Sequence, residues 1–361
     1  MSVYFQEAIS TAARMRQERL TKPKGALGQL ERVAIQMAGI QAEEQPEARP
    51  AYCLLFASDH PVCRHGVSAY PQEVTAAMLE NFVRGGAAAS VMCSQLDIPL
   101  MVHDVGVKTS VYHKMTNNNT MYGELHRHAC AQMPVGDLRT EDAMDPEVFR
   151  AAWTAGCNAV HSLRPNPKVL LLGEMGIGNT TVASVVAGGL LGLCAKDVVG
   201  QGTGLDDEGM QRKFAVVQDA LMRLEGESQP FEVLRKAGGR ELVAMAAAAE
   251  TALEARCAVL VDGFIVSTAV LALCTKRPEL SDGLIFAHQS REPAHRAVIS
   301  RLQSMQTQNE PSGILLDLQM ALGEGSGALA AFPLVEMACA THRCMATFAE
   351  AEVPGRLETL P

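Results

Sequence analysis

The segment "LLGEMGIGNTT", residues 171–181, combines residue types that could bind a ligand and take part in chemistry. It places the end of an apolar strand directly before glycines, the carboxylate of Glu174, and the polar side chains of Asn179, Thr180 and Thr181. Glycines let the backbone approach a ligand closely, and threonines at a helix start leave N–H groups free to bind an anion. Because the spacing matches neither GxxxxGK[ST] nor GxGxxG, an ordinary tight turn fits the pattern equally well. The carboxylate favours a ligand site, since a negative charge beside an anion site is costly unless it has a role.

A second carboxylate, Glu324, lies in "MALGEGSGALAAF", residues 320–332, between Gly323 and Gly325 and next to an apolar helix. Partial desolvation in such a place raises the pKa of a carboxyl group, which suits a general base near neutral pH. The alternative is an acid at a helix N-terminus that the helix dipole stabilises. The pattern favours the general base.

Two further segments offer groups that could bind a phosphate. In "GQGTGLDDEGMQRK", residues 200–213, Gly202 lies in a flexible turn, and Lys213 follows late enough in the next helix to reach an anion. The acidic residues 206–208 are more typical of a helix start than of a metal site, because no further ligand has matching spacing. In "FAHQSREPAHR", Ser290 could help to bind a phosphate or could cap a helix.

The segment "SDHPVCRHGVSAYPQEVT" carries His60, His65, Ser68 and Tyr70 ahead of a predicted helix. Without a third ligand at a suitable spacing, structural histidines are the better interpretation than a metal pair. The chain also lacks GxSxG and HExxH motifs, and no cysteine has an obvious histidine partner. Nucleophilic hydrolase chemistry is therefore unsupported.

Six short apolar runs alternate with helical segments and are expected to be the strands that position these loops. Each run is continuous rather than alternating, as in parallel strands that are buried on both faces. The sequence therefore predicts an α/β fold with an open, mostly parallel, Rossmann-like sheet flanked by helices. Ligands bind beyond the carboxyl ends of the strands in such sheets, which is where the polar residues above lie. The runs are "AYCLLFAS" (51–58), "PLMVHDVG" (99–106), "KVLLLGE" (168–174), "CAVLVDGF" (257–264), "GLIFAHQ" (283–289) and "GILLDL" (313–318).

The two ends of the chain are expected to form a small helical domain. Residues 4–40 predict two helices, and the polar linker "QAEEQPEARP" separates them from the first strand. Residues 332–348 are helical again and could pack against the first two helices. We therefore assign residues 1–45 and 332–361 to a small helical domain and residues 46–331 to a large α/β domain that carries the site.

The composition restricts the class of protein. The chain has 361 residues, of which 48% are hydrophobic and 20% charged, as expected for a well-packed globular protein. A net charge of −9 without a basic run argues against nucleic-acid binding. The N-terminus does not resemble a signal peptide, and the longest apolar run is too short to cross a bilayer. Ten cysteines without a CxxC pair indicate reduced core thiols, so we expect a cytoplasmic protein that does not bind membranes.

Taken together, these segments resemble one family, nicotinate-nucleotide–dimethylbenzimidazole phosphoribosyltransferase. The resemblance rests on "GEMGIGNTT", "GTGLDDEG" followed by "RK", "DGFI", "AHQS", "LGEGSGA", and upstream on "GVSAYPQEVT" and "DVGV". It runs in order over nearly the whole chain. It implies a dimeric enzyme without metal or cofactor that moves the 5-phosphoribosyl group of nicotinate mononucleotide onto an aromatic base with inversion from β to α. The product would be the lower-ligand ribotide of a cobamide.

The resemblance also implies roles for residues of this sequence. Glu324 would be the general base that removes the azole proton, and Glu174 would position the substrate or stabilise positive charge on the ribose. The ribose-phosphate pocket would be formed by Gly176, Gly178, Asn179, Thr180, Gly202, Lys213 and Ser290. The pocket for the aromatic base would be lined by Ser68, Tyr70 and Leu322.

One departure from the family leaves the acceptor open. Relatives that use a benzimidazole often have a glutamine shortly after the "EVT" block, where this chain continues with Ala76, Ala77 and Met78. Phenol or p-cresol as the acceptor, with this chain as one subunit of a paralogous heterodimer, is therefore the main alternative. A non-catalytic partner subunit is disfavoured by the two glutamates. A dinucleotide-dependent oxidoreductase is disfavoured because GxGxxG with a later acid is not found.

Overall fold

The protein is built around one parallel six-stranded sheet. The computed structural model describes residues 4–108, 123–202 and 204–354. Every strand pair in this part of the chain is parallel, and the strand order is β3-β2-β1-β4-β5-β6. The predicted α/β class and parallel sheet are thus confirmed. The strands are β1 (Ala51–Ser58), β2 (Leu100–Gly106), β3 (Glu124–Arg127), β4 (Val169–Met175), β5 (Ala258–Val261) and β6 (Leu284–Phe286).

The strand order creates a switch point between β1 and β4. From β1 the chain moves outward through β2 and β3 on one side, and from β4 it moves outward through β5 and β6 on the other. This is the strand order of the Rossmann fold, in which the crevice at the switch point receives the ligand. Phe56 of β1 pairs in register with Glu174 of β4, so the first predicted site residue lies at this crevice.

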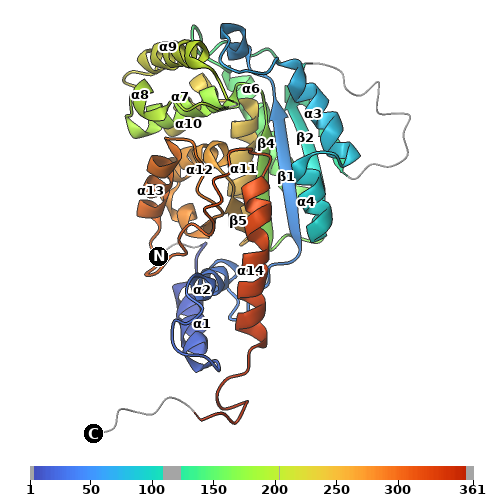
Figure 1. Ribbon diagram of the computed structural model, residues 1–361, viewed down its shortest axis with the longest axis vertical. Coiled ribbons are helices and arrows are strands. Elements are labelled where there is room, and N and C mark those ends of the chain that lie inside the picture. The colour runs from blue at the N-terminus through green and yellow to red at the C-terminus, as the bar shows by residue number, and fades with distance from the viewer. Residues whose placement is uncertain (1–3, 109–122, 203, 355–361) are drawn as a thin grey trace.

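Helices cover both faces of the sheet (Figure 1). Alternate residues of β1 enter different cores: Leu54 and Phe56 face one helical layer, and Cys53 and Leu55 face the other. This double burial explains why the strands are apolar throughout. The first layer contains α6 (Pro146–His161), α7 (Asn179–Leu191), α9 (Asp207–Arg223), α10 (Pro230–Ala237), α11 (Arg240–Glu254), α12 (Phe264–Lys276) and α13 (His295–Met305). The second contains α2 (Gln29–Gln41), α3 (Glu73–Arg84), α4 (Ala88–Leu96) and α14 (Ser326–Cys344).

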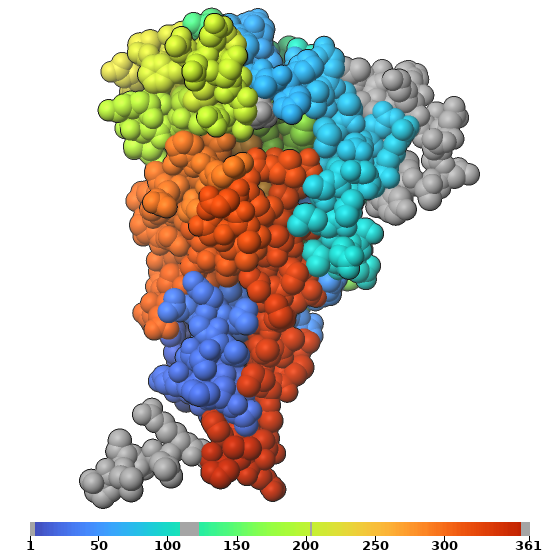
Figure 2. Space-filling view, viewed as in Figure 1, coloured from blue at the N-terminus to red at the C-terminus, as the bar shows by residue number. Residues whose placement is uncertain are grey.

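The two ends of the chain meet at one end of the molecule (Figures 1 and 2). Helix α1 (Glu7–Arg19) packs on α2, which in turn packs on α14. Gln17 of α1 and His342 of α14 are joined by a buried hydrogen bond of 2.8 Å, and Leu20 forms a β-bridge with Thr347. The two predicted N-terminal helices are thus present, and α14 begins six residues earlier than the predicted residue 332. The division into two domains stays a prediction, and its ends at residues 1–3 and 355–361 lie outside the described residues.

One strand prediction was wrong, and one strand was missed. The run at 313–318 is not a strand, although Leu315 and Leu316 donate hydrogen bonds of 3.0 and 2.9 Å to Phe286 and Ala287. The segment continues with exposed residues, so only a single bridge between Leu316 and His288 forms. Strand β3, "ELHR", was missed because it is a polar edge strand without an apolar run.

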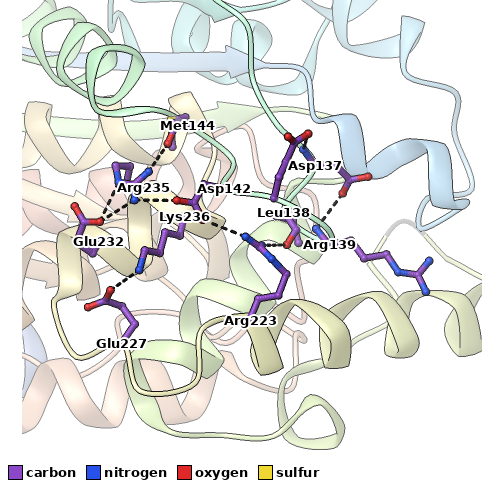
Figure 3. Close-up of polar contacts among 11 residues, drawn as sticks. Asp137, Leu138, Arg139, Asp142, Met144, Arg223, Glu227, Glu232, Arg235 and Lys236 are labelled. Carbon is purple, nitrogen blue, oxygen red and sulfur yellow. Dashed lines mark hydrogen bonds and ion pairs between the residues drawn. The ribbon is translucent and has the colours of Figure 1, made fainter.

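An ion-pair network holds α9, the helix that carries Lys213 (Figure 3). Arg223 at the end of α9 pairs with Asp142 at 3.1 Å, and Asp219 pairs with Arg139 at 2.8 Å. Arg223 also donates to the carbonyl of Leu138 at 2.7 Å. Single exposed pairs contribute about 0–1 kcal/mol, but several linked pairs restrict a helix more than one does. The network therefore fixes α9 against the segment that precedes α6.

Candidate active site

Glu174 is buried at the end of β4, where the predicted glycine turn begins. The turn leads into α7, whose N-cap is Gly178 with a φ of +92°, a conformation that favours glycine. Asn179, the first residue of α7, donates a short side-chain hydrogen bond to the Glu174 carboxyl group. The backbone N–H of Ile177 donates to Thr75 Oγ1 of α3 at 3.1 Å. The turn is thus held on both sides and presents Glu174 at the switch point.

Glu324 lies in a turn of three consecutive residues with positive φ before α14. Glycines on both sides, Gly323 and Gly325, lower the strain of this left-handed path, and Glu324 itself has a φ of +61°. Its side chain is 6% exposed, and Oε2 accepts a hydrogen bond of 3.3 Å from the backbone N–H of Ala89 in α4. The N-terminus of α4 therefore supports a negative charge on this carboxylate.

The fold brings the two glutamates together although they lie far apart in the sequence. A Cβ atom on Gly323 would overlap the Glu174 carboxyl group, and the backbone N–H of Glu324 donates to that carboxyl group. A Cβ on Gly173 would lie 2.7 Å from the carbonyl oxygen of Glu324. The strand end and the turn thus touch through glycines that leave no room for side chains.

Burial raises the pKa of both carboxyl groups. For Glu174 the pKa is raised to about 8, first by burial and then by the negative charges of Asp262, Glu241 and Glu324. For Glu324 the pKa is raised by burial and by Asp262, and the hydrogen bond from Ala89 opposes this shift. A carboxyl group with a raised pKa is a suitable proton acceptor near neutral pH.

Asp262 is a buried site residue that the sequence did not single out. It follows β5, and its Oδ1 accepts hydrogen bonds of 2.6 and 3.0 Å from the backbone N–H groups of Gly327 and Ala328 in α14. It therefore caps the helix whose entry turn holds Glu324. His288 lies 3.7 Å from the same oxygen and lines the pocket. Both follow strand ends and lie in the segments "DGFI" and "AHQS" of the family resemblance, which are the signals that could have identified them.

A buried lysine lies at the other end of the site. Lys213 is fully buried, and its Nζ donates to Thr180 Oγ1 at 3.1 Å and to the carbonyl of Gly200 at 2.9 Å. Burial lowers its pKa to about 8, and the charge of Glu292 opposes this shift. A Cβ on Gly202 would lie 2.9 Å from Thr180 Oγ1 and 3.2 Å from Lys213 Nζ, so glycine at this position leaves room for both side chains.

Two helices direct their N-termini at the same pocket. Within the described part of the chain, no side chain caps α7 or α12 at these ends. The pocket is lined there by Asn179 and Thr180 of α7 and by the first three residues of α12, 264–266. Ser290 lies beside them and is 7% exposed, and its backbone N–H donates to His295 Nδ1 at 3.0 Å. In α7 the N–H groups of Asn179 and Thr181 already donate to the carbonyls of Gly176 and Gly178, so the two helix dipoles and the remaining N–H groups of the first turns are what suit an anion.

These groups surround one cavity of about 330 Å³, which lies within the usual range for small-molecule sites. Figure 2 shows its mouth as a hollow between the α3 region, the α7–α9 region and the segment before α14. One wall is apolar and contains Val74 and Met78 of α3, together with Met175. Tyr70 and Leu322 stand at the mouth, about half exposed. The cavity is therefore polar at one end, where Lys213 lies behind Thr180, and apolar at the other.

Most predicted site residues are brought together by the fold. Glu174, Glu324, Gly176, Asn179, Thr180, Gly202, Ser290, Tyr70 and Leu322 line the cavity. Lys213 reaches it through Thr180. Besides Lys213, two predicted residues are not in the wall. Gly178 packs against Cys63 behind the turn, and the Ser68 hydroxyl accepts from the backbone N–H of Tyr70. Three residues follow the "EVT" block, where relatives often have a glutamine. Met78 lines the cavity, whereas Ala76 is buried and Ala77 is exposed.

The described residues offer neither a metal site nor a membrane span. No group of three or more His, Cys, Asp or Glu side chains among them is arranged to hold a metal ion. None of the described helices has both the length and the apolar character needed to span a membrane. The absence of a metal from the reaction stays a prediction.

The fold and the pocket define the class as parallel α/β proteins with a small-molecule site at the switch point of the sheet. A family model described as "Phosphoribosyltransferase" matches residues 4–353. The chain is 43% identical to the nicotinate-nucleotide–dimethylbenzimidazole phosphoribosyltransferase of Bradyrhizobium sp. strain BTAi1, over 97% of this chain and 95% of that protein. It is also 43% identical to the protein of that name from Pseudomonas aeruginosa, over 94% and 93%.

Solved structures agree with these relatives. The crystal structure of CobT from Thermus thermophilus matches with a TM-score of 0.85 and 39% identity, over 96% of this chain and 99% of that one. A second structure from the same organism, described as the same kind of phosphoribosyltransferase, matches with a TM-score of 0.84 and 38% identity, over 97% and 100%. The chain therefore belongs to the phosphoribosyltransferase family that these proteins represent.

Proposed function

We propose that this protein transfers the 5-phosphoribosyl group of nicotinate mononucleotide to 5,6-dimethylbenzimidazole or a similar aromatic base, with inversion from β to α. The products are nicotinate and the α-ribotide that serves as a cobamide lower ligand. The names of the relatives support both substrates. The observation that carries the proposal is a single pocket that contains two buried carboxylates, adjoins a buried lysine through Thr180, and is lined by the first residues of two helices.

The lysine end of the pocket fits the 5′-phosphate. Thr180, Gly202 and Ser290 line the pocket beside Lys213, and the first residues of α7 and α12 line the same end. An ammonium group and helix N-termini together bind a phosphate through charge-assisted hydrogen bonds. A bound dianion also stabilises the protonated form of Lys213.

The apolar end of the pocket fits an aromatic acceptor. Val74, Met78 and Tyr70 on one side and Leu322 on the other can contact the faces and edges of a flat ring. Aromatic side chains and the thioether of methionine interact favourably with such rings. The acceptor nitrogen is then directed toward the carboxylates.

The chemical step needs a base rather than an acid. The azole nitrogen forms a bond to the anomeric carbon while the bond from that carbon to the pyridinium nitrogen breaks. The bond electrons pass to the ring nitrogen, which becomes neutral, so the leaving group needs no proton. Glu324 accepts the proton of the azole N–H. Glu174 faces the positive charge that develops on the ribose and stabilises it.

The direct test is turnover. Purified protein is incubated with nicotinate mononucleotide and 5,6-dimethylbenzimidazole, and nicotinate release is measured by chromatography. We expect nicotinate in equal amount to a ribotide whose anomeric proton signal indicates the α configuration. No turnover with this base or with phenol as acceptor would refute the proposal.

Glu324→Gln tests the base. Because a general base contributes about 10²–10⁴-fold, we expect kcat to fall at least about tenfold while the thermal unfolding curve stays that of a folded protein. Glu208→Gln, in the exposed first turn of α9, is the matched control and should keep wild-type turnover. An unchanged kcat in Glu324→Gln would remove Glu324 as the base.

The phenol alternative is not favoured, because the relatives are named for dimethylbenzimidazole. A homodimer in the cytoplasm stays our expectation. Light scattering of the purified protein, alone and with a paralogue, distinguishes a homodimer from a heterodimer.

A further inference from the structure

An acid–imidazole pair lies directly behind the glycine turn, and the reaction described above does not use it. His60 follows β1, and Glu241 is the second residue of α11. Both are buried, and His60 Nε2 lies 3.0 Å from Glu241 Oε1. The angles at this contact lie outside the range of a hydrogen bond. Among the described residues, His60 Nε2 and both carboxylate oxygens of Glu241 have no hydrogen-bond partner. A fully buried carboxylate without a hydrogen bond calls for an explanation.

Glycines show how tightly the pair is enclosed. A Cβ on Gly176 would lie 2.5 Å from the carbonyl oxygen of Ser58 and 2.9 Å from His60 Nε2. A Cβ on Gly239, the N-cap of α11, would overlap both the His60 ring and the Glu241 carboxylate. The imidazole is therefore wedged between the turn of the site and the N-terminus of α11. Movement of the ring toward the turn would press on the backbone of Gly176, two residues after Glu174.

The pair is also close enough to act on Glu174 electrostatically. Three charges face Glu174: Asp262 after β5, Glu241 of α11, and Glu324 before α14, and each raises its pKa. Arg240, next to Glu241, directs its guanidinium group at the carbonyls of Cys130 and Gly106 instead. His60 is thus the polar group placed between the Glu241 carboxylate and the turn.

We propose that His60 and Glu241 are a positioning pair, which holds the turn at residues 176–178 and keeps Glu174 in place for the reaction. This inference rests on the proposed function. Neither residue lines the pocket, so the pair acts through Glu174 and the backbone and does not touch substrate. Loss of the imidazole leaves a buried carboxylate without a partner, which is costly unless the backbone moves to admit water.

The first experiment compares His60→Leu, His60→Gln and the control His65→Gln by steady-state kinetics. His65 belongs to the same segment but pairs with Asp137 at 2.6 Å, away from the turn. We expect His60→Leu to lower kcat at least about tenfold, with the KM for nicotinate mononucleotide changed less than about threefold, because misplacement of a reacting group lowers kcat. His60→Gln keeps an N–H donor and should lose less. His65→Gln should match the wild type. Wild-type kcat in a folded His60→Leu overturns the proposal.

The second experiment uses Glu241→Gln and the pH dependence of kcat/KM. Removal of this negative charge lowers the pKa of Glu174, so the acid limb should move to lower pH by at least about half a unit. A purely structural residue would not shift that limb. An unchanged profile with wild-type kcat overturns the proposal.

If His60→Leu does not fold, the double variant His60→Leu/Glu241→Leu leaves no buried charge unpaired and is measured instead. A reduced kcat at unchanged KM supports the proposal, and wild-type kinetics overturn it. If the double variant also fails to fold, the Glu241→Gln profile decides.

A failure of the proposed function is recognised separately. If the wild type releases no nicotinate, the function is refuted, and amide hydrogen exchange over residues 174–179 tests the pair alone. Exchange should be at least about tenfold faster in His60→Leu than in His65→Gln, because local opening becomes easier. Equal exchange in the two variants overturns the positioning role.

Discussion

Replacement of Glu174 by glutamine should stabilise the protein at alkaline pH and have much less effect near pH 4.5. Glu174 is buried, and its pKa is raised from 4.5 to about 8. Between these two values the folded state keeps the proton and the unfolded state releases it. The folded state therefore binds more protons, and the stability contributed by this group falls as pH rises. Glutamine has no proton to lose, so the variant escapes this loss.

The magnitude follows from the width of the window. At about 1.4 kcal/mol for each pH unit, the loss in the wild type accumulates to about 5 kcal/mol by pH 8.5. Glutamine offers one acceptor oxygen where the carboxyl group accepts from both Asn179 and the backbone of Glu324, which costs about 1–2 kcal/mol at every pH. Because this cost is the same at every pH, the net advantage of the variant should reach about 3–4 kcal/mol at pH 8.5. At the average unfolding entropy per residue, this corresponds to a gain in Tm of about 5 °C.

The assay is urea unfolding at 25 °C, followed by circular dichroism, at several pH values from about 4.5 to 8.5. The control is Glu208→Gln, because the Glu208 side chain is 86% exposed and its removal should change stability by less than about 0.5 kcal/mol at any pH. Turnover should fall in Glu174→Gln at alkaline pH, where the wild type carries the carboxylate that stabilises the ribose. Stability would then be gained where activity is lost.

Parallel stability curves for the wild type and Glu174→Gln across this pH range would refute the reasoning. They would mean that Glu174 ionises alike in the folded and unfolded states. A curve for Glu208→Gln that follows Glu174→Gln would equally contradict an effect specific to the buried site.

Two further predictions concern the phosphate end and the turn before α14. The affinity for nicotinate mononucleotide should fall as pH rises through about 8, where the Lys213 ammonium group loses its proton. Lys213→Met should weaken binding at least about tenfold. Calorimetry at neutral and alkaline pH checks both expectations, and a pH-independent affinity contradicts them. Gly173→Ala should lower kcat at least about tenfold, because the new methyl group lies 2.7 Å from the carbonyl oxygen of Glu324 and displaces the turn. Wild-type kcat in the folded variant would mean that the turn tolerates this shift.

The sequence predicted the central strands well because their environment leaves a local signal. Strand β1 covers the predicted residues 51–58, and every residue in it is buried. Local signals failed at the edges of the sheet. The run at 313–318 is apolar but ends after one bridge, and β3 contains one apolar residue, Leu125, among polar ones. Whether an edge segment forms a strand depends on its packing against one neighbouring strand, and this contact is not visible in the local sequence pattern.

Part of the candidate site also left a local signal in the sequence. Glycines marked Glu174 and Glu324 as unusual carboxylates, and the fold places both in one pocket. Asp262 and Glu241 escaped notice because a lone acid at a strand end or helix start looks like any surface residue. Their burial, and hence their effect on the pKa of Glu174, exists only in the folded chain.

The sequence by itself determined the alternation of strands and helices, the identity of the chemical groups and the family resemblance, because these depend on residue type and local spacing. The tertiary structure alone decided which groups meet. The order of the strands brings β1 beside β4, so that His60 and Glu241 lie behind the turn that carries Glu174. Contact and burial between residues far apart in the chain set the pKa values, and only the packed fold supplies both.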